Sequence, residues 1–472
     1  MKRVLLALSF LFIQPLMGQE LTSNNTSLNE AFKLAVRTVD INTRRGILAA
    51  GADYGGEWTR DISINSWNAA SLLRPEVAEN SLWSVTLNKD TVGHQYWDKI
   101  LWVIAAWQHY QINGNREFLE QAYKCSVNTM KQLENQVFDS KYGLFKGPSV
   151  FNDGIAAYPE PIYEPGNYSS AVTKHKNSAY IKCLSTNCIY YGAYQSLVQM
   201  AKELEKMQSV VQNFQQKAVQ LKSNIIKHLY DKEQNKLNYL IDQNGKVDSS
   251  QEGLGISFAV LFDIIEGEKA RSLIENAKVS KFGITSIYPD FPRYSAKKPG
   301  RHNNIIWPMV NGFFAAAAIK SRNYTTFSNE LFNLTKLALN EKMGDYNFRE
   351  VYNPYTGKPD GGFQDNEQGL PDFHWESCRL QTWSATAYLN MVLHGVFGLR
   401  YSNTEMAFSP FLPESINQIS LKNLIYRNAM LDISIAGKGR VIKSFLLDGK
   451  IKSSTKFPSN LAGRHKIQII LE

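Results

Sequence analysis

Residues 96–137 read YWDKILWVIAAWQHYQINGNREFLEQAYKCSVNTMKQLENQV. Apolar side chains recur every three or four residues in two blocks, residues 96–110 and 116–137, and this is the period of an α-helix. Between the blocks stands Asn113-Gly114-Asn115, which has the residue types of a tight turn. Helices joined by so short a turn run antiparallel, so the stretch predicts a helical hairpin.

The same helical period continues along most of the chain. It predicts further helices at residues 28–39, 62–73, 77–87, 185–204, 210–229, 254–264, 269–277, 307–319, 325–339 and 380–393. Together with the first hairpin these make twelve helices, and six successive hairpins predict a mainly α fold, an (α/α)6 toroid.

After residue 399 the apolar period changes from helical to alternating. Residues 431–435, 444–447 and 466–470 alternate as strands do, and Asp448-Gly449 is a hairpin signal. We therefore expect a barrel over residues 19–399 and a small antiparallel β domain over residues 400–472.

The first 18 residues have the layout of a secretory signal peptide. Lys2 and Arg3 precede the apolar run Val4 to Phe12, and small Gly18 follows. The run is far shorter than the roughly 20 residues that span a bilayer. We expect cleavage near residue 18, a secreted or periplasmic location and no membrane insertion afterwards; a retained anchor is the alternative.

Charge and motifs exclude several classes of protein. The net charge of +9 falls to +7 (9 minus 2) without Lys2 and Arg3, and no basic block or nucleic-acid-binding motif is present, so no nucleic-acid partner is expected. GxSxG, HExxH, P-loop and dinucleotide glycine motifs are also absent. We expect no cofactor and no metal site. The oligomeric state cannot be deduced from these patterns.

The four cysteines do not form a metal-binding or scaffold pattern. They are Cys125, Cys183, Cys188 and Cys378, with no CxxC pair. Export permits disulfides, so Cys183 and Cys188 could form a local bridge, and buried thiols are the equal alternative.

Three long loops hold most of the residues suited to chemistry. Residues 40–60, 138–184 and 342–379 are rich in Asp, Glu, His, Trp and Gly and follow successive hairpins. Loops of this length are usually functional or disordered, so we expect a pocket at one end of the barrel.

The first of these loops runs into Trp58-Thr59-Arg60-Asp61 at a predicted helix start. Arg60 and Asp61 form an adjacent donor and acceptor that suit vicinal sugar hydroxyls, and Trp58 offers a flat face to a sugar ring. The alternative is structural, because Asp61 also favours a helix N-terminus and pairs with Arg60.

Two further carboxylates stand in loops. Asp153 follows a stretch rich in aromatics and glycine, where an acid retains its proton to higher pH, as a general acid requires. An Asx turn before Gly154 is the structural alternative, and Glu160 and Glu164 are rival acids. Glu350 precedes a tight turn and could activate water as a general base, or it could be a surface acid.

Other residues have the character of pocket lining: Asn303, Asn304, Trp307, Tyr352 and Trp375. His302 and His374 lie in aromatic surroundings. A histidine there is more often a structural hydrogen-bonding partner than a catalyst, so neither is predicted to be catalytic.

The order of these segments resembles a group of glycoside hydrolases. Residues 58–61 resemble the W-x-R-D element of glucoamylase-like and amylo-α-1,6-glucosidase-like enzymes. Glu350 with residues 352–357 is similar to the E-x-Y/F-D/N-P-x-T-G element of glycoside hydrolase families 15 and 63, and Asp153 to the general acid of the family 63 processing glucosidases and mannosylglycerate hydrolases. Residues 302–308 and the segment after residue 408 continue the likeness.

The resemblance covers most of residues 50–450. It departs in the context after Asp153 and in the absence of a large N-terminal β domain, which leaves the acid and the exact family open. It implies a six-hairpin exo-glycosidase that removes a terminal, α-linked hexose from an oligo- or polysaccharide with inversion. Asp153 would be the general acid, Glu350 the general base, and Arg60 with Asp61 would hold the terminal sugar.

Two other readings remain. A polysaccharide lyase on an α/α barrel would suit the positive charge, with Tyr168, His175, Asn177 and Tyr180 as its candidate residues. A non-catalytic glycan-binding component would retain the stacking aromatics without needing two opposed carboxylates.

Overall fold

The computed structural model describes residues 18–56, 58–164, 171–340, 345–364 and 371–472. Apart from Gly18, the predicted signal peptide lies outside the described residues. Twelve helical segments appear within them, at the positions that periodicity predicts. They are α1 (Thr26–Ile41), α2 (Thr59–Asn65) continued by η1 (Ser66–Ala70) and α3 (Ser71–Leu73), α4 (Pro75–Ser84), α5 (Leu101–Asn113), α6 (Arg116–Val137), α7 (Leu184–Glu203), α8 (Gln208–Leu229), α9 (Gly253–Leu261), α10 (Gly267–Glu275), α11 (Pro308–Lys320), α12 (Tyr324–Ala338), and α13 (Thr382–Asn390) continued by η5 (Met391–Val396).

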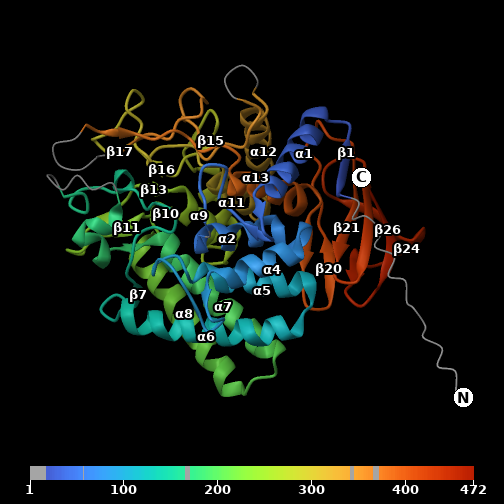
Figure 1. Ribbon diagram of the computed structural model, residues 1–472, viewed down its shortest axis with the longest axis horizontal. Helices are drawn as coiled ribbons and strands as arrows, with labels where there is room; N and C mark the ends of the chain where they lie inside the picture. Colours follow the sequence, from blue (N-terminus) through green and yellow to red (C-terminus); the bar gives the residue numbers. More distant parts are fainter. Residues whose placement is uncertain (1–17, 57, 165–170, 341–344, 365–370) are drawn as a thin grey trace, which may run out of the picture.

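These segments form two concentric rings. Six inner helices contact one another in the closed cycle α2, α5, α7, α9, α11, α13 and back to α2. The other six, α1, α4, α6, α8, α10 and α12, pack outside them (Figure 1). The fold is therefore the predicted six-hairpin toroid.

Sequence composition decides which ring each helix joins. Inner α5 is apolar on nearly all sides, and almost every residue from Leu101 to Ile112 is buried. Outer α6 buries one stripe and keeps a polar face toward solvent. An all-round apolar helix must be surrounded by protein, whereas an amphipathic one suits the surface. Residues 96–100, predicted as helix, form turns ahead of α5.

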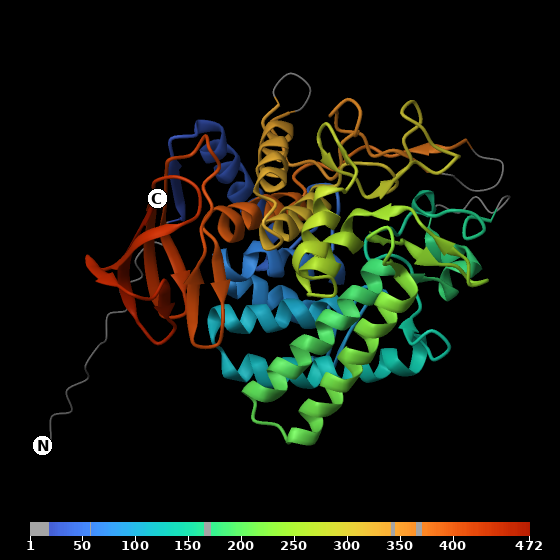
Figure 2. The same ribbon diagram turned by 180° about the vertical axis from the view of Figure 1, so that it is seen from behind.

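The C-terminal part of the chain is a sheet packed at one side of the toroid (Figures 1 and 2). Its six strands have the order β1-β21-β22-β26-β23-β24. The strands after residue 398 are β19 (Leu399–Tyr401), β20 (Glu405–Phe408), β21 (Gln418–Tyr426), β22 (Ala429–Ala436), β23 (Ile442–Leu447), β24 (Lys450–Lys452), β25 (Lys456–Pro458) and β26 (Gly463–Leu471).

Two details of this sheet go beyond the predicted antiparallel domain. β22 and β26 run parallel, whereas the other pairs are antiparallel. The edge strand β1 (Glu20–Ser23) comes from the other end of the chain and pairs with β21. At the predicted hairpin, Asp448 and Gly449 both have positive φ, as a type I′ turn requires. The division at residues 399 and 400 stays a prediction.

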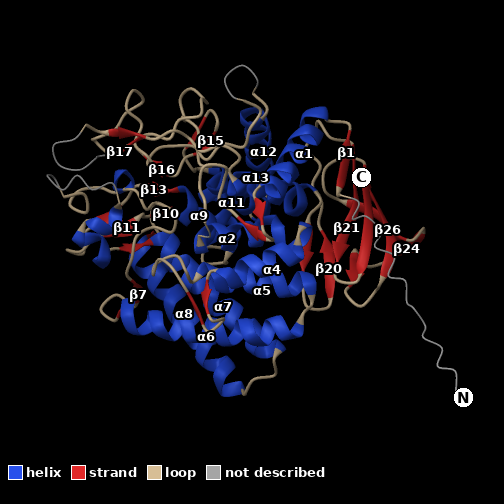
Figure 3. Cartoon of the chain, viewed as in Figure 1, coloured by secondary structure: helices blue, strands red, loops and turns tan. Residues whose placement is uncertain are grey.

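The loops at the N-terminal ends of the inner helices are long and carry only short strands and single turns, grouped away from the sheet (Figure 3). The two-residue strands are β2 (Thr43–Arg44), β3 (Ile47–Leu48), β4 (Thr86–Leu87), β5 (Thr91–Val92), β6 (Phe138–Asp139), β7 (Leu144–Phe145), β8 (Lys182–Cys183), β9 (Tyr230–Asp231), β10 (Lys236–Leu237), β11 (Leu240–Ile241), β12 (Val247–Asp248), β13 (Gln251–Glu252), β14 (Val279–Ser280), β15 (Gly283–Ile284), β16 (Ile287–Tyr288), β17 (Phe363–Gln364) and β18 (Phe373–His374). The 3-10 turns are η2 (Ile155–Ala157), η3 (Val172–Lys174) and η4 (Lys176–Tyr180).

Two features bear on the compartment and the cysteines. Among the described residues, no helix is both long and apolar enough to cross a bilayer. All four cysteines are free and buried, so Cys183 and Cys188 do not form the local bridge that the sequence left open.

A buried carboxyl group connects α12 of the outer ring to α11 of the inner ring and to β15 in the loop before α11. Glu330 of α12 accepts hydrogen bonds from the Ile284 amide at 2.9 Å and from Asn311 Nδ2 of α11 at 2.7 Å. The side chain is 2 % exposed. Burial raises the pKa of Glu330 to about 7, and the bond from Asn311 lowers it by less.

We predict that Glu330→Gln makes stability less dependent on pH. Between about pH 4.5 and 7 the unfolded wild type loses the Glu330 proton and the folded wild type keeps it, so the wild type loses stability as pH rises. Relative to the wild type, the variant should gain up to about 1.4 kcal/mol per pH unit over this window. Urea unfolding at pH 5 and pH 7 measures this change. A difference between the two proteins that is the same at both pH values would contradict it.

Candidate functional site

The N-terminal ends of the inner helices surround a cavity of about 140 Å³. Its walls come from the loop before α2, from the loop between β7 and η2, from the segment before α11, and from the loops before α13. The lining residues are Ala50, Tyr54, Trp58, Arg60, Asp61, Asp153, Arg301, His302, Trp307, Glu350, Trp375, Gln381 and Trp383. Segments that are more than 300 residues apart in the sequence thus meet at one place.

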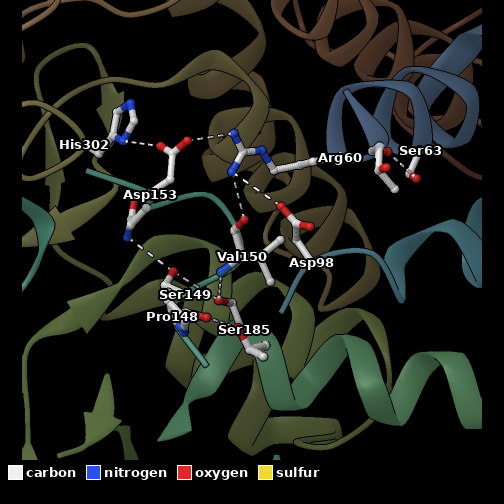
Figure 4. A network of polar contacts seen from close by, with 12 residues as sticks. Arg60, Ser63, Asp98, Pro148, Ser149, Val150, Asp153, Ser185 and His302 are labelled. Atoms are coloured by element: carbon white, nitrogen blue, oxygen red, sulfur yellow. Dashed lines mark hydrogen bonds and ion pairs between the residues drawn. The ribbon is translucent and has the colours of Figure 1, made fainter. Parts of the chain in front are cut away.

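Asp153 is held at the cavity by two basic groups (Figure 4). Its Oδ2 lies 3.2 Å from Arg60 Nη2, and its Oδ1 lies 3.1 Å from His302 Nδ1. Arg60, from the first turn of α2, also pairs with Asp98, 3.6 Å from Nη1, just before α5. The carboxyl group of Asp153 is partly exposed, whereas Arg60 and Asp98 are buried.

A second layer of polar contacts holds the loop that carries Asp153. The Val150 amide donates to Ser185 Oγ at 3.1 Å, at the start of α7 (Figure 4). Glu252, just before α9, accepts hydrogen bonds from Ser149 Oγ and from the Ser185 amide. Two inner helices therefore fix the position of the loop.

The charges around Asp153 keep it ionised in this arrangement. Burial raises the pKa of Asp153, but Arg60, the hydrogen bond from His302 and the charge of Arg301 together hold it well below its usual range. The neighbouring Asp61 lies in the opposite situation. Burial raises the pKa of Asp61 to about 7, although Arg60 lowers it.

Glu350 lies on the cavity wall and is 5 % exposed. Its Oε2 accepts a hydrogen bond from the Tyr54 hydroxyl at 3.1 Å and one from the Cys378 amide at 3.4 Å. Its Oε1 has no hydrogen-bonding partner among the described residues. Burial raises the pKa of Glu350, whereas Arg301 and Tyr54 lower it.

Several lining side chains present buried polar atoms that no described residue satisfies. They are both amide atoms of Gln381 and the indole nitrogens of Trp307, Trp375 and Trp383. Buried polar groups almost always have hydrogen-bonding partners, so these atoms are exceptions among the described residues. Trp375 also stacks on the Arg301 guanidinium at 3.7 Å.

Most of the residues predicted from sequence meet at this cavity. Asp153, Glu350, Trp58, Arg60, Asp61, Trp307 and Trp375 all line it. Trp58 is 43 % exposed, as a residue at the mouth of the cavity would be.

Three predicted pocket residues do not line the cavity. Tyr352 is 1 % exposed, packs with Ile306 and Leu337, and donates its hydroxyl to the Asn347 carbonyl. The side chain of Asn304 is occupied by Asp290 and Tyr355. Asn303 is fully buried and outside the cavity lining.

The rival residues also lie elsewhere. Glu160 is exposed, and Glu164 lies near Lys176 at 3.9 Å; neither lines the cavity. Of the set considered for a lyase, Tyr168 lies outside the described residues, Asn177 binds the Pro161 carbonyl, and His175 and Tyr180 are absent from the lining.

Six lining residues are not among those predicted from sequence: Ala50, Tyr54, Arg301, His302, Gln381 and Trp383. Sequence patterns favour a structural role for His302. Tyr54 stands beside Gly55-Gly56 in the same loop as Trp58, and that proximity is a usable signal. Asp98 lies outside the three long loops, so no local pattern marks it.

Comparison with known proteins was made by sequence and by structure. The sequence profile of the mannosylglycerate hydrolase MGH1-like glycoside hydrolase domain matches residues 63–384. A search of curated proteins finds no match.

Solved structures share the fold at low sequence identity. A sialidase structure aligns with a TM-score of 0.70 and 14 % identity over 94 % of this chain, which spans 40 % of that protein. The GH63 mannosylglycerate hydrolase from Thermus thermophilus, in complex with glucose, gives 0.59 and 14 % over 76 % of this chain and 99 % of that one. A GH78 rhamnosidase of Bacillus sp. GL1 gives 0.61 and 13 % over 89 % and 41 %.

We predict that Tyr54→Phe raises the pKa of Glu350 by about one unit, because it removes a hydrogen bond that favours the ionised form. Side-chain carboxyl ¹³C NMR titration, with the signal assigned through Glu350→Gln, measures this change. Tyr355→Phe is the matched control, since its hydroxyl binds Asp290 outside the cavity. An unchanged pKa in Tyr54→Phe would show that the bond does not influence Glu350.

Proposed function

Because the chain belongs to the mannosylglycerate hydrolase MGH1-like glycoside hydrolase family, we propose that its cavity removes one terminal α-linked hexose from an oligo- or polysaccharide with inversion at the anomeric carbon. The chain is a hydrolase of glycosyl bonds with a carbohydrate substrate. One observation carries the finer proposal: Asp153 and Glu350 face one small cavity whose remaining walls carry aromatic rings and unsatisfied polar atoms.

Asp153 is the proposed general acid. It stands on a loop that is held by two inner helices. Its side chain is 31 % exposed, whereas that of Asp98, the other carboxyl group that pairs with Arg60, is 1 % exposed. A general acid must hold a proton when the bond breaks. Arg60 and His302 must therefore loosen their hold on Asp153 once the substrate is bound.

Glu350 is the proposed general base. Tyr54 and the Cys378 amide fix one oxygen, and the other oxygen, Oε1, is left to accept a proton from water. An inverting enzyme requires a base that directs water to the face of the sugar opposite the acid. The bonds from Tyr54 and Cys378 both favour ionised Glu350, the form that such a base needs.

The dimensions of the cavity support exo action. At about 140 Å³ it is smaller than the 300–1,000 Å³ usual for small-molecule sites, which suits one terminal unit better than a continuous chain. Trp58 at the mouth offers a face for the next unit. Arg60 and Asp61 line the same cavity and are buried, and in this proposal they hold the hydroxyl groups of the terminal sugar.

Export of the mature protein is part of the same proposal. The basic pair Lys2 and Arg3, the short apolar run after it and Gly18 support a signal peptide. A secreted or periplasmic hydrolase would meet extracellular glycans.

We predict that Asp153→Asn and Glu350→Gln each lower kcat/KM by about 10²–10⁴-fold on methyl α-glycosides, because these leaving groups need both acid and base. Methyl α-mannoside, α-glucoside and α-rhamnoside form the first panel. Glu160→Gln, outside the cavity, should stay within about twofold of wild type. Equal losses in Glu160→Gln and Asp153→Asn would reassign the acid.

We predict that the first product released from an α-linked substrate is the β-anomer. Proton NMR of the anomeric signal within the first minutes of the reaction measures this, before mutarotation mixes the forms. An α-anomer would show retention instead of inversion. A lack of turnover with every glycoside in a broad panel would overturn the proposed hydrolysis.

A further inference from the structure

Arg60 lies between two carboxyl groups without a close bond to either. Its Nη2 is 3.2 Å from Asp153 and its Nη1 is 3.6 Å from Asp98. A third contact, from Nη1 to the Val150 carbonyl, is 3.4 Å long. Charge-assisted bonds of this kind are normally about 2.7–2.9 Å, so each of these contacts of the guanidinium is longer than usual. Its Nε has no described partner.

Asp98 is a buried carboxyl group with almost nothing to stabilise its charge. It is 1 % exposed, and neither oxygen accepts a hydrogen bond from another described residue. Burial raises the pKa of Asp98 to about 7, and Arg60 is the main group that lowers it. An unsatisfied carboxyl group is costly to bury, so its presence beside the guanidinium that pairs with Asp153 needs an explanation.

The proposed reaction requires Asp153 to take up a proton while it lies beside Arg60. Arg60 favours ionised Asp153, whereas the proposed reaction requires protonated Asp153. If Arg60 had no other partner, proton uptake by Asp153 would leave a buried cation uncompensated, which is strongly unfavourable.

We propose that Asp98 is a positioning residue that takes over Arg60 when Asp153 becomes protonated. This role rests on the proposed glycosidase function. In one state Arg60 binds ionised Asp153, and Asp98 holds the proton. In the other, Arg60 binds ionised Asp98, and Asp153 holds the proton that passes to the glycosidic oxygen. The three side chains share one proton in both states, so their net charge does not change.

The movement that separates the states is small. Closing the Nη1–Oδ2 distance from 3.6 Å to roughly 2.9 Å requires a shift of about 0.7 Å. The centroids of the Phe151 and Trp383 rings each lie 5.8 Å from the guanidinium carbon of Arg60. Figure 4 shows Arg60 extending between Asp98 and Asp153.

The kinetic test compares two leaving groups. Asp98→Asn leaves Arg60 fixed on Asp153, so the general acid should lose its proton at lower pH. We expect the alkaline limb of the kcat/KM profile to shift down by at least about one pH unit on a methyl α-glycoside, with a loss of roughly 10-fold or more at pH 7. The matching glycosyl fluoride needs no protonation of its leaving group and should lose less than about threefold.

The controls separate this role from a merely structural one. Asp98→Glu should recover most of the alkaline limb. Glu330→Gln alters an equally buried carboxyl group that lies away from the cavity and whose pKa is also raised to about 7. This variant should leave kcat/KM unchanged on both substrates. Equal losses on fluoride and methyl glycoside, or an unmoved limb, would overturn the proposal. Wild-type protein that hydrolyses neither substrate would instead overturn the proposed function.

A second measurement does not depend on activity. In a crystal structure of Asp98→Asn, the distance from Arg60 Nη2 to Asp153 should shorten from 3.2 Å to below about 3.0 Å, since the competing carboxylate is gone. An Arg60 that stays between the two positions would overturn the proposal, whatever the kinetic result.

Discussion

A buried guanidinium at the first turn of α2 constrains the whole candidate site. Arg60 is 7 % exposed, and a cation so far from water is stable only where anions surround it. Asp153, Asp98 and the adjacent Asp61 provide that surrounding charge from three separate segments. Their pKa values are driven apart as a result: low for Asp153, and raised to about 7 for the two that burial dominates.

The toroid holds these charged groups in position. Six inner helices close on one another, so their N-terminal ends form a rigid rim. Loops attached to that rim can be long without being loose, because contacts such as Val150 to Ser185 and Ser149 to Glu252 fasten them to α7 and α9. A rigid scaffold under irregular loops is a common way to hold reacting groups in position.

The sequence was sufficient for the architecture and for part of the site. All-round apolar segments such as α5 and amphipathic ones such as α6 have distinct patterns, and their alternation is enough to predict hairpins. Asp153 follows a stretch rich in aromatics and glycine, and Glu350 precedes a tight turn, so both could be predicted as site residues from their local sequence. Tyr352, Asn303 and Asn304 share that local composition but point elsewhere, because the direction of a side chain in a turn depends on backbone geometry. Asp98 could not be predicted from its local sequence, because its proposed role depends on its proximity to Arg60, which is 38 residues away in the chain.

The edge strand β1 has a consequence for how the chain assembles. Glu20 pairs with Lys422, so β1 finds its partner only after most of the polypeptide exists. The same holds for α2, which closes the inner ring against α13. Contacts this distant in sequence form slowly, since a large loop must close before they contribute any stability. A chain with such ordering stays incompletely folded until most of it has been synthesised.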